Sequence, residues 1–293
     1  MEATFLSQVI LPFSLFVIMW GMGLSLKVDD FSRVLSQPKA AMVGIFCQMV
    51  MLPLVGYLVV LLFGFSAELA VGLMILTFCP GGVTSNMFSY LSNGDTALSI
   101  SLTAVVSVIT PFTIPVLSVL VMNWFMSESQ QFVIPLLKTI IQLLVITVVP
   151  VVIGMIVHSK FPVFSAKAER PVKIFSVVFL FVIIAGIIAK EWQNMAGYFV
   201  QSGVATLVLN VLTLTLGYFV ANWTGLKDRQ AISIGIEVGI QNGTLALLVT
   251  GTILQNALMT IPAITYSLIM FATGAVFGWV VNQKRNREIK QAV

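Results

Sequence analysis

Long apolar runs separated by short polar connections dominate the hydrophobic pattern of this 293-residue chain. A helix that crosses a bilayer needs about 20 mainly apolar residues, and nine runs reach or approach that length. They cover residues 5–26, 40–63, 67–91, 96–124, 132–157, 172–190, 197–223, 230–254 and 258–281. The runs lack the two-residue alternation of a membrane barrel. We therefore predict an all-α polytopic membrane protein with nine transmembrane helices.

Composition agrees with a bilayer as the solvent. Hydrophobic residues make up 58% of the chain and charged residues 9%, against about 25% charged residues in soluble domains. Cys47 and Cys79 both lie in apolar runs, and His158 is the single histidine, which argues against a disulfide framework and against a Cys/His metal site. Most basic residues lie in short connections, so the net charge of +4 does not indicate nucleic-acid binding.

The basic residues also predict an orientation. No lysine or arginine precedes Lys27, and the first apolar run is too long for a signal peptide, so we expect a retained helix. If the N-terminus lies on the outer side of the membrane, Lys190 is the one basic residue in an outer connection, and Lys138 lies in the outer half of the fifth helix. The cytoplasmic side then holds Lys27, Arg33, Lys39, Lys160, Lys167, Arg170, Lys173, Lys227, Arg229, Lys284, Arg285, Arg287 and Lys290. The positive-inside rule therefore predicts an inner (plasma) membrane protein with a basic cytoplasmic tail at 282–293.

The third predicted helix contains an interruption near its middle. The sequence Cys79-Pro-Gly-Gly82 combines a residue that lacks an amide donor with two that weaken helices. Three oxygen-bearing side chains follow, in the sequence Thr84-Ser-Asn86, at a depth where polar groups are costly. A simple kink whose polar residues bond a neighbouring helix is the plainer interpretation. We expect a broken helix that carries a binding site.

The eighth predicted helix carries one carboxylate well inside the span. Glu237 lies about seven residues from the start of its run, where a charge costs about 2.5–3.5 kcal/mol on insertion scales. Lys138 is the nearest basic residue in depth, and it lies closer to the outer end of its helix. A bound cation or a proton is therefore the expected partner. Gln241 lies one turn later, on the same helical face.

The two interrupted helices occupy equivalent places in two halves of the chain. Residues 1–131 hold the first four helices, residues 132–157 form a connecting helix, and residues 172–281 hold the last four. One intervening helix gives the halves opposite orientations, so they form inverted repeats. The third helix is interrupted in each, and such paired interruptions are typical of the binding site of a secondary transporter.

Three motifs resemble the bile acid:sodium symporter family, and the resemblance extends over almost the whole chain. The motifs are Pro80-Gly-Gly-Val-Thr-Ser-Asn86, Gly94-Asp-Thr-Ala-Leu-Ser99 and Glu237-Val-Gly-Ile-Gln-Asn242. The resemblance implies two broken helices that cross in a core domain, formed here by 40–124 and 197–281. A panel domain would comprise 1–26, 132–157 and 172–190. Nine helices would match the animal members, since bacterial members often have ten.

The resemblance also implies two sodium ions. The first site would comprise Ser85, Asn86, Ser99, Thr103 and Glu237. The second would comprise Gln48, Glu237 and Gln241, with the carbonyls near Val238 and Ile240. All these ligands are hard oxygens, and Ser99 and Thr103 share a helical face because they are four residues apart.

The resemblance further implies an organic anion as substrate, bile-acid-like or a smaller carboxylate, taken up by sodium symport. Asn242, Val83 and Thr84 are its expected contacts. Some members carry a small polar residue where this chain has Val83, which weakens the case for bile acids. We expect no partner besides this substrate and the lipid bilayer.

Other functions stay open. Glu237 could carry a proton, or the chain could export its substrate like the related arsenite permeases, with Cys79 as a thiol near the site. A membrane receptor without transport is a further alternative. An enzyme is disfavoured, because His158 lies in a basic loop and no two carboxylates share a span.

Overall fold

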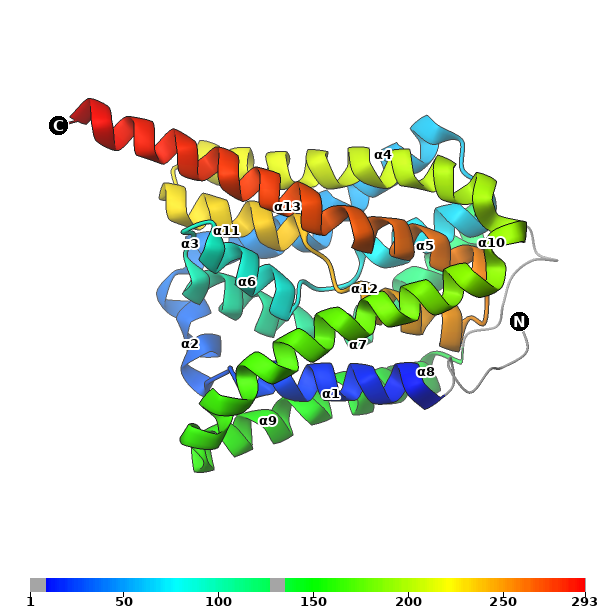
Figure 1. Cartoon of the computed structure of the whole chain (residues 1–293), viewed down its shortest axis with the longest axis horizontal. Coiled ribbons are helices and arrows are strands. Elements are labelled where there is room, and N and C mark those ends of the chain that lie inside the picture. Colours follow the sequence, from blue (N-terminus) through cyan, green and yellow to red (C-terminus); the bar gives the residue numbers. More distant parts are fainter. Residues whose placement is uncertain (1–8, 127–134, 293) are drawn as a thin grey trace.

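The computed structural model describes residues 9–126 and 135–292, and all regular secondary structure in these ranges is helical (Figure 1). The all-α fold class is therefore confirmed. The side chains of 169, 173, 176, 187, 188, 190–196 and 285–292 lie outside the described residues. The predicted first and fifth helices begin at residues 5 and 132, which also lie outside the described ranges.

The described residues form thirteen α-helices and three complete π-helical turns. The helices are α1 (Leu11–Gly23), α2 (Val28–Ser36), α3 (Pro38–Phe46), α4 (Leu52–Phe63), α5 (Ala67–Thr77), α6 (Val83–Leu91), α7 (Thr96–Phe125), α8 (Leu136–Leu143), α9 (Val149–Lys160), α10 (Pro162–Trp223), α11 (Asp228–Gly239), α12 (Gly243–Leu247) and α13 (Ala257–Ala292). The π turns are η2 (Cys47–Met51), η4 (Leu144–Val148) and η5 (Leu248–Ile253). Each π turn continues an α-helix directly, so α3–α4, α8–α9 and α12–η5 are continuous helical segments.

Six helical segments among the described residues are long and apolar enough to cross a membrane. They are Pro38–Phe63, Thr96–Phe125, Leu136–Lys160, Gly197–Trp223, Asp228–Ile253 and Ala257–Lys284. A seventh results if α1 and α2, which are bent by 66°, form one span. The chain is thus a multi-pass membrane protein. The count of nine stays a prediction, because α5 and α6 are separate helices of 11 and 9 residues.

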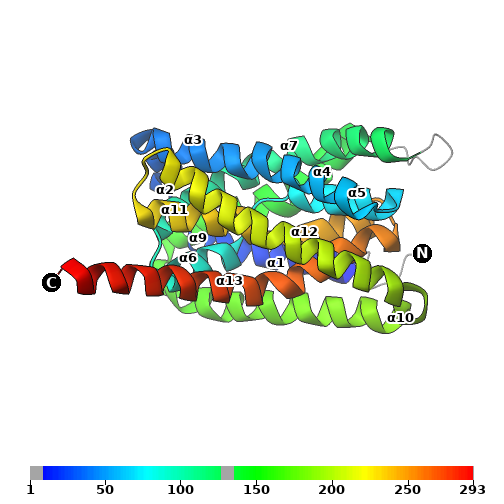
Figure 2. The ribbon, with the colours of Figure 1, turned by 90° about the horizontal axis from the view of Figure 1, so that it is seen from above.

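The basic connection at 158–171 is helical, which corrects the expectation of a loop. Only Phe161 interrupts the helices, and Pro162 starts α10 at a position where proline's missing amide donor costs nothing. The ribbon of α10 then doubles back on itself (Figures 1 and 2). This one element therefore covers both predicted segments, 172–190 and 197–223.

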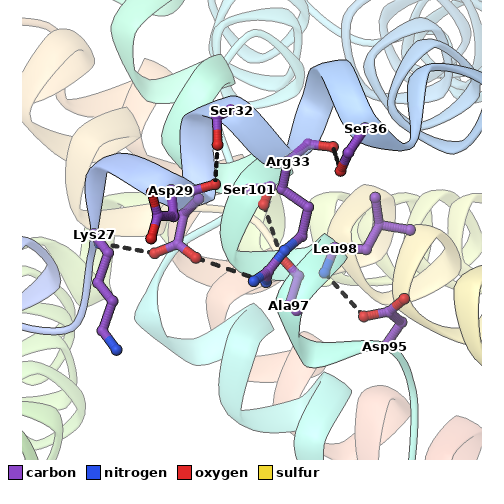
Figure 3. Close-up of polar contacts among 10 residues, drawn as sticks. Lys27, Asp29, Ser32, Arg33, Ser36, Asp95, Ala97, Leu98 and Ser101 are labelled. Atoms are coloured by element: carbon purple, nitrogen blue, oxygen red, sulfur yellow. Dashed lines mark hydrogen bonds and ion pairs between the residues drawn. The ribbon is translucent and has the colours of Figure 1, made fainter.

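A short polar helix, α2, packs against the first part of α7 (Figure 3). The Lys27 amide donates to the Asp30 carboxylate at 2.8 Å, and Arg33 lies 3.7 Å from the same carboxylate. Asp95 caps α7 by accepting from the Leu98 amide at 3.1 Å. The segment after the first apolar run is therefore a helix with its own cap and ion pair.

The segment Asp228–Ile253 lies at the centre of the bundle. Its apolar window is 100% buried, whereas the other five long segments are between 28% and 50% buried. Gly235 of α11 lies against Gly217 and Leu214 of α10, and such small residues allow helix backbones to approach closely. Glu237 therefore lies in the most enclosed part of the protein.

A close approach of α5 and α13 depends on Gly72. A Cβ atom at Gly72 would collide with the Met259 backbone carbonyl, so Gly72→Ala should destabilise the protein by about 1–3 kcal/mol. The measurement is thermal unfolding in detergent. Gly203→Ala is the matched control, because a Cβ there meets no atom within 4 Å. Equal unfolding temperatures for the two variants would contradict this packing.

Candidate functional site

The two predicted helix breaks are present, and they touch in the middle of the bundle (Figure 1). The first break separates α5 from α6 and the second separates α11 from α12. The Asn242 amide of the second break donates to the Pro80 carbonyl of the first at 2.9 Å. Two segments about 160 residues apart in sequence are therefore joined by main-chain atoms, and the side chains on either side are brought together.

Each break is shaped by the residues that start the second half of the helix. The Gly82 amide donates to Ser85 Oγ at 3.1 Å, and the Ser85 hydroxyl donates back to the Gly82 carbonyl at 2.8 Å. Asn242 Oδ1 accepts from the Leu245 amide at 3.0 Å, as an N-cap residue does. These local caps satisfy amide donors that the interrupted helices would otherwise leave unpaired.

The predicted residues of the first sodium site gather around the Glu237 carboxylate. Ser99 donates to Oε1 at 2.5 Å and Thr103 donates to Oε2 at 2.6 Å. Both hydroxyls also lie near Asn86 Oδ1, at 2.9 Å and 3.4 Å. These contacts join α6, α7 and α11, and Glu237 is 2% exposed.

Ser85 also belongs to this group, because the backbone at Gly81 passes close to both Ser85 and the Glu237 carboxylate. A Cβ atom at Gly81 would lie 2.8 Å from Ser85 Oγ and 3.3 Å from the Glu237 carboxyl carbon. Glycine at this position is therefore required for the contact of the break with the carboxylate. The ion pair described above joins Arg33 and Asp30. Among the described residues, no basic side chain pairs with Glu237.

The predicted residues of the second site also meet. Gln48 Nε2 donates to Gln241 Oε1 at 2.9 Å and to the Cys79 carbonyl at 3.1 Å. Gln241 Nε2 donates to the carbonyls of Val238 at 2.7 Å and Glu237 at 3.2 Å. Ile240, whose carbonyl is the remaining predicted ligand of this set, is the first residue of the second break.

Gln48 stands out for its backbone and for its free oxygen. It lies in the π turn η2, directly before the turn that contains Pro53, and π turns inside helices occur often at functional sites. Its side chain is 4% exposed, and Oε1 is without a hydrogen-bond partner. A buried amide oxygen without a donor is costly, and this one is available as a ligand.

A cleft opens beside the breaks. Its empty space, counted out to the open mouth, is about 510 Å³. The breaks contribute Gly82, Val83, Thr84, Gln241, Asn242, Gly243 and Thr244 to its lining. All three expected substrate contacts therefore line it. Asn242 is 6% exposed, and its side-chain nitrogen Nδ2 has no hydrogen-bond partner.

The apolar part of the lining of this cleft could not be predicted from the sequence. It comprises Ile18 of α1, Val177 and Leu180 of α10, and Met270 and Phe271 of α13, with Met87 of α6 beside them. These are apolar residues in apolar runs, and nothing in their local sequence separates them from residues that face lipid.

Comparison with known proteins gives a consistent result. The profile of the sodium bile acid symporter family matches residues 12–198. The uncharacterized sodium-dependent transporter YocS of Bacillus subtilis is 28% identical over 274 residues, which cover 92% of this chain and 81% of YocS. The human ileal sodium/bile acid cotransporter is 30% identical over 290 residues, which cover 94% and 80%. The probable sodium/metabolite cotransporter BASS2 of rice chloroplasts is 26% identical, with 88% and 60% covered.

The hydrogen bonds to Glu237 should contribute measurably to stability. Thr103→Val keeps the shape of the side chain but removes a donor to a buried carboxylate, so it should cost about 1.5–3 kcal/mol. Thr250→Val is the control, because the Thr250 hydroxyl bonds only the Ala246 carbonyl of its own helix. Thermal unfolding in detergent compares the two variants. A loss for Thr103→Val no larger than the control's would contradict the described site.

Proposed function

Because the chain belongs to the sodium bile acid symporter family, we propose that it is a secondary active transporter that couples sodium entry to uptake of an organic anion. The observation that carries this proposal is the Glu237 carboxylate at the junction of the two broken helices. It is buried, it has oxygen-bearing neighbours from α6 and α7, and no described basic side chain pairs with it. A cation is the partner that such a group calls for.

The first sodium ion would bind Ser85, Asn86, Ser99, Thr103 and Glu237. The hydroxyls that now donate to the carboxylate can rotate and turn their lone pairs toward an ion, because a hydroxyl is both donor and acceptor. One carboxylate then neutralises the ion, and neutral oxygens complete the shell. The donor set suits sodium, and it suits a transition metal poorly.

The second sodium ion would bind Gln48, Glu237 and Gln241 together with the Val238 and Ile240 carbonyls. The Gln48 oxygen supports this assignment, because it is buried and unpartnered. Gln241 would have to turn its amide, since its Nε2 now donates to the Val238 carbonyl, one of these ligands, and to the neighbouring Glu237 carbonyl. Sodium and the amide hydrogens would therefore compete for these oxygens.

Coupling would follow from what the two ions connect. The first ion would tie α6 and α7 to α11, and the second would tie η2 to α11. Both would hold the breaks in the arrangement that shapes the cleft. Sodium would then raise the affinity for substrate, and substrate would raise the affinity for sodium by the same factor.

The substrate would be an organic anion with an apolar body, bile-acid-like or a smaller carboxylate. Asn242 Nδ2 is an unpartnered donor within the cleft, and Thr84 offers a hydroxyl in the first turn of α6, where the helix dipole favours negative charge. The apolar wall that includes Phe271 would contact the body of the molecule. Val83 would contact it from the first break.

The same reasoning extends to the architecture. We infer inverted repeats at 1–131 and 172–281 joined by the helix at 132–157, with a core of 40–124 and 197–281 that moves against a panel of 1–26, 132–157 and 172–190. The packing of α1 against α9 supports the panel. The start of α1 and the end of α13 lie at opposite ends of the bundle (Figure 1), which supports an odd number of spans such as nine. The positions of the basic residues support an N-terminus outside and a cytoplasmic tail at 282–293 in the inner (plasma) membrane.

Export of the arsenite-permease type gains no support from Cys79. Its thiol donates to the Ile75 carbonyl of the preceding helix α5 at 3.4 Å, as a buried structural cysteine does. Proton coupling through Glu237 is separated from sodium coupling by the next experiment.

Glu237→Gln should abolish the sodium response of the folded protein. We expect sodium chloride, compared with potassium chloride at equal ionic strength and pH, to raise the unfolding temperature of the wild type by mass action. The variant should lose this rise, because an amide cannot neutralise the ion, and sodium affinity should fall at least about tenfold. Sodium-driven uptake into liposomes should be lost with it.

Glu68→Gln is the matched control, since Glu68 lies in the first turn of α5, away from the breaks. It should keep the wild-type sodium response. A Glu237→Gln variant that is still stabilised by sodium and still takes up substrate would overturn the sodium assignment. A wild type that responds to pH but not to sodium would indicate a proton instead.

Asn242→Asp should separate substrate binding from sodium binding. Aspartate keeps the cap oxygen for the Leu245 amide but removes the donor in the cleft and adds a negative charge. We expect at least about a tenfold loss of affinity for carboxylates, screened from pyruvate to cholate by thermal shift in sodium. Sodium stabilisation alone should persist. The control is Asn256→Asp, which caps α13 in the same way; equal anion affinity in both variants would contradict the assigned cleft.

A further inference from the structure

The Gly239 carbonyl at the end of α11 is held by two buried side chains from other helices. Asn210 Nδ2 of α10 donates to it at 2.6 Å, and the Tyr266 hydroxyl of α13 donates to it at 2.8 Å. Asn210 is 0% exposed and Tyr266 is 1% exposed. Neither residue belongs to the proposed sodium ligands, and both lie in otherwise apolar runs.

The helix break explains why this carbonyl needs outside donors. In a continuous helix it would accept from the amide of Gly243, four residues later. Here the Gly243 amide donates to the Gln241 carbonyl at 3.0 Å. A carbonyl left unpaired at this depth would be costly, and the two side chains replace the missing donor.

The Asn210 amide is itself fixed in orientation. The Thr273 hydroxyl of α13 donates to Asn210 Oδ1, and the Ile269 carbonyl lies 3.0 Å from the same hydroxyl oxygen. The Gly239 carbonyl can only accept, so the amide nitrogen must face it and the amide oxygen faces Thr273. The Gly239 carbonyl is thus held by a small network that spans α10, α11 and α13.

We propose that Asn210 and Tyr266 are positioning residues for the second sodium site. This inference rests on the proposed sodium symport. The carbonyls of Val238 and Ile240, two of the proposed ligands, flank the Gly239 carbonyl along the chain. Peptide units are planar, so fixing one of them restricts its neighbours to the φ and ψ rotations between them.

Residue 239 is glycine, which has more φ and ψ freedom than any other residue. The backbone by itself would hold the neighbouring carbonyls poorly. The two hydrogen bonds to the Gly239 oxygen supply the missing restraint. A purely structural role would stabilise the fold equally with and without sodium, whereas a positioning role changes sodium affinity.

The direct experiment is Tyr266→Phe, which removes one oxygen atom and keeps the ring. We expect the sodium concentration for half-maximal stabilisation, and for half-maximal uptake, to rise about three- to tenfold. Uptake at saturating sodium should stay near the wild-type rate, and the preference for sodium over lithium should shrink. Tyr218→Phe is the matched control, because its hydroxyl bonds Asp228 at the opposite end of α11.

A second pair of variants tests the same network from Thr273. Thr273→Val removes the hydroxyl that orients Asn210 and should raise the sodium requirement in the same direction, while Thr273→Ser keeps the hydroxyl and should restore it. These variants decide the question if Tyr266→Phe does not fold. Unchanged sodium dependence in Tyr266→Phe or Thr273→Val, with the response lost in Glu237→Gln, would overturn the positioning role alone. An unchanged response in Glu237→Gln would overturn sodium symport itself.

Discussion

The Glu237 carboxylate is the group on which the arrangement of the central helices depends. A carboxylate enclosed by a helix bundle in a membrane is costly unless polar atoms surround it. The chain supplies these atoms from α6 and α7, and bringing them close requires the first helix to break beside the carboxylate. Gly81 allows the backbone of that break to pass next to Glu237 without a side chain in the way. Burial of one charged group thus explains the break, the glycine and the hydroxyls of α7 together.

The two breaks are tolerated because backbone groups that they expose find partners within the protein, among them the carbonyls of Pro80, Cys79 and Gly239. Hydrocarbon offers no hydrogen bonds, so non-helical backbone is stable at this depth only where protein atoms satisfy it. Ser85 and Asn242 cap the second halves of the two helices. The side-chain amide of Gln241 donates to carbonyls at the end of α11. The breaks are therefore built structures with fixed geometry, and they can present oxygens and amide donors at defined positions.

Local chemistry made the centre of the molecule predictable. Proline followed by two glycines marks a break, and a lone carboxylate in an apolar run marks a polar site. The residues that gather around Glu237 followed from the family resemblance, and their role as sodium ligands stays a prediction. Tertiary packing decided the rest. The π turn at Gln48 leaves no local signal, and Leu180 lines the cleft although its sequence context matches that of lipid-facing neighbours. The basic residues before α10 were expected to form a loop. They are helical, because a helix can continue beyond its apolar segment and the length of that segment does not show where the helix ends.

The bond between the Asn242 amide and the Pro80 carbonyl has an evolutionary consequence. Both atoms belong to the main chain, so the joint between the two broken helices does not depend on the side chains that face the cleft. Substitutions at Val83 or Phe271 can therefore reshape the cleft while the joint persists. A protein built in this way can change the molecules that its cleft accepts while the contact between the broken helices is kept. Relatives whose names specify metabolites or bile acids are consistent with such change.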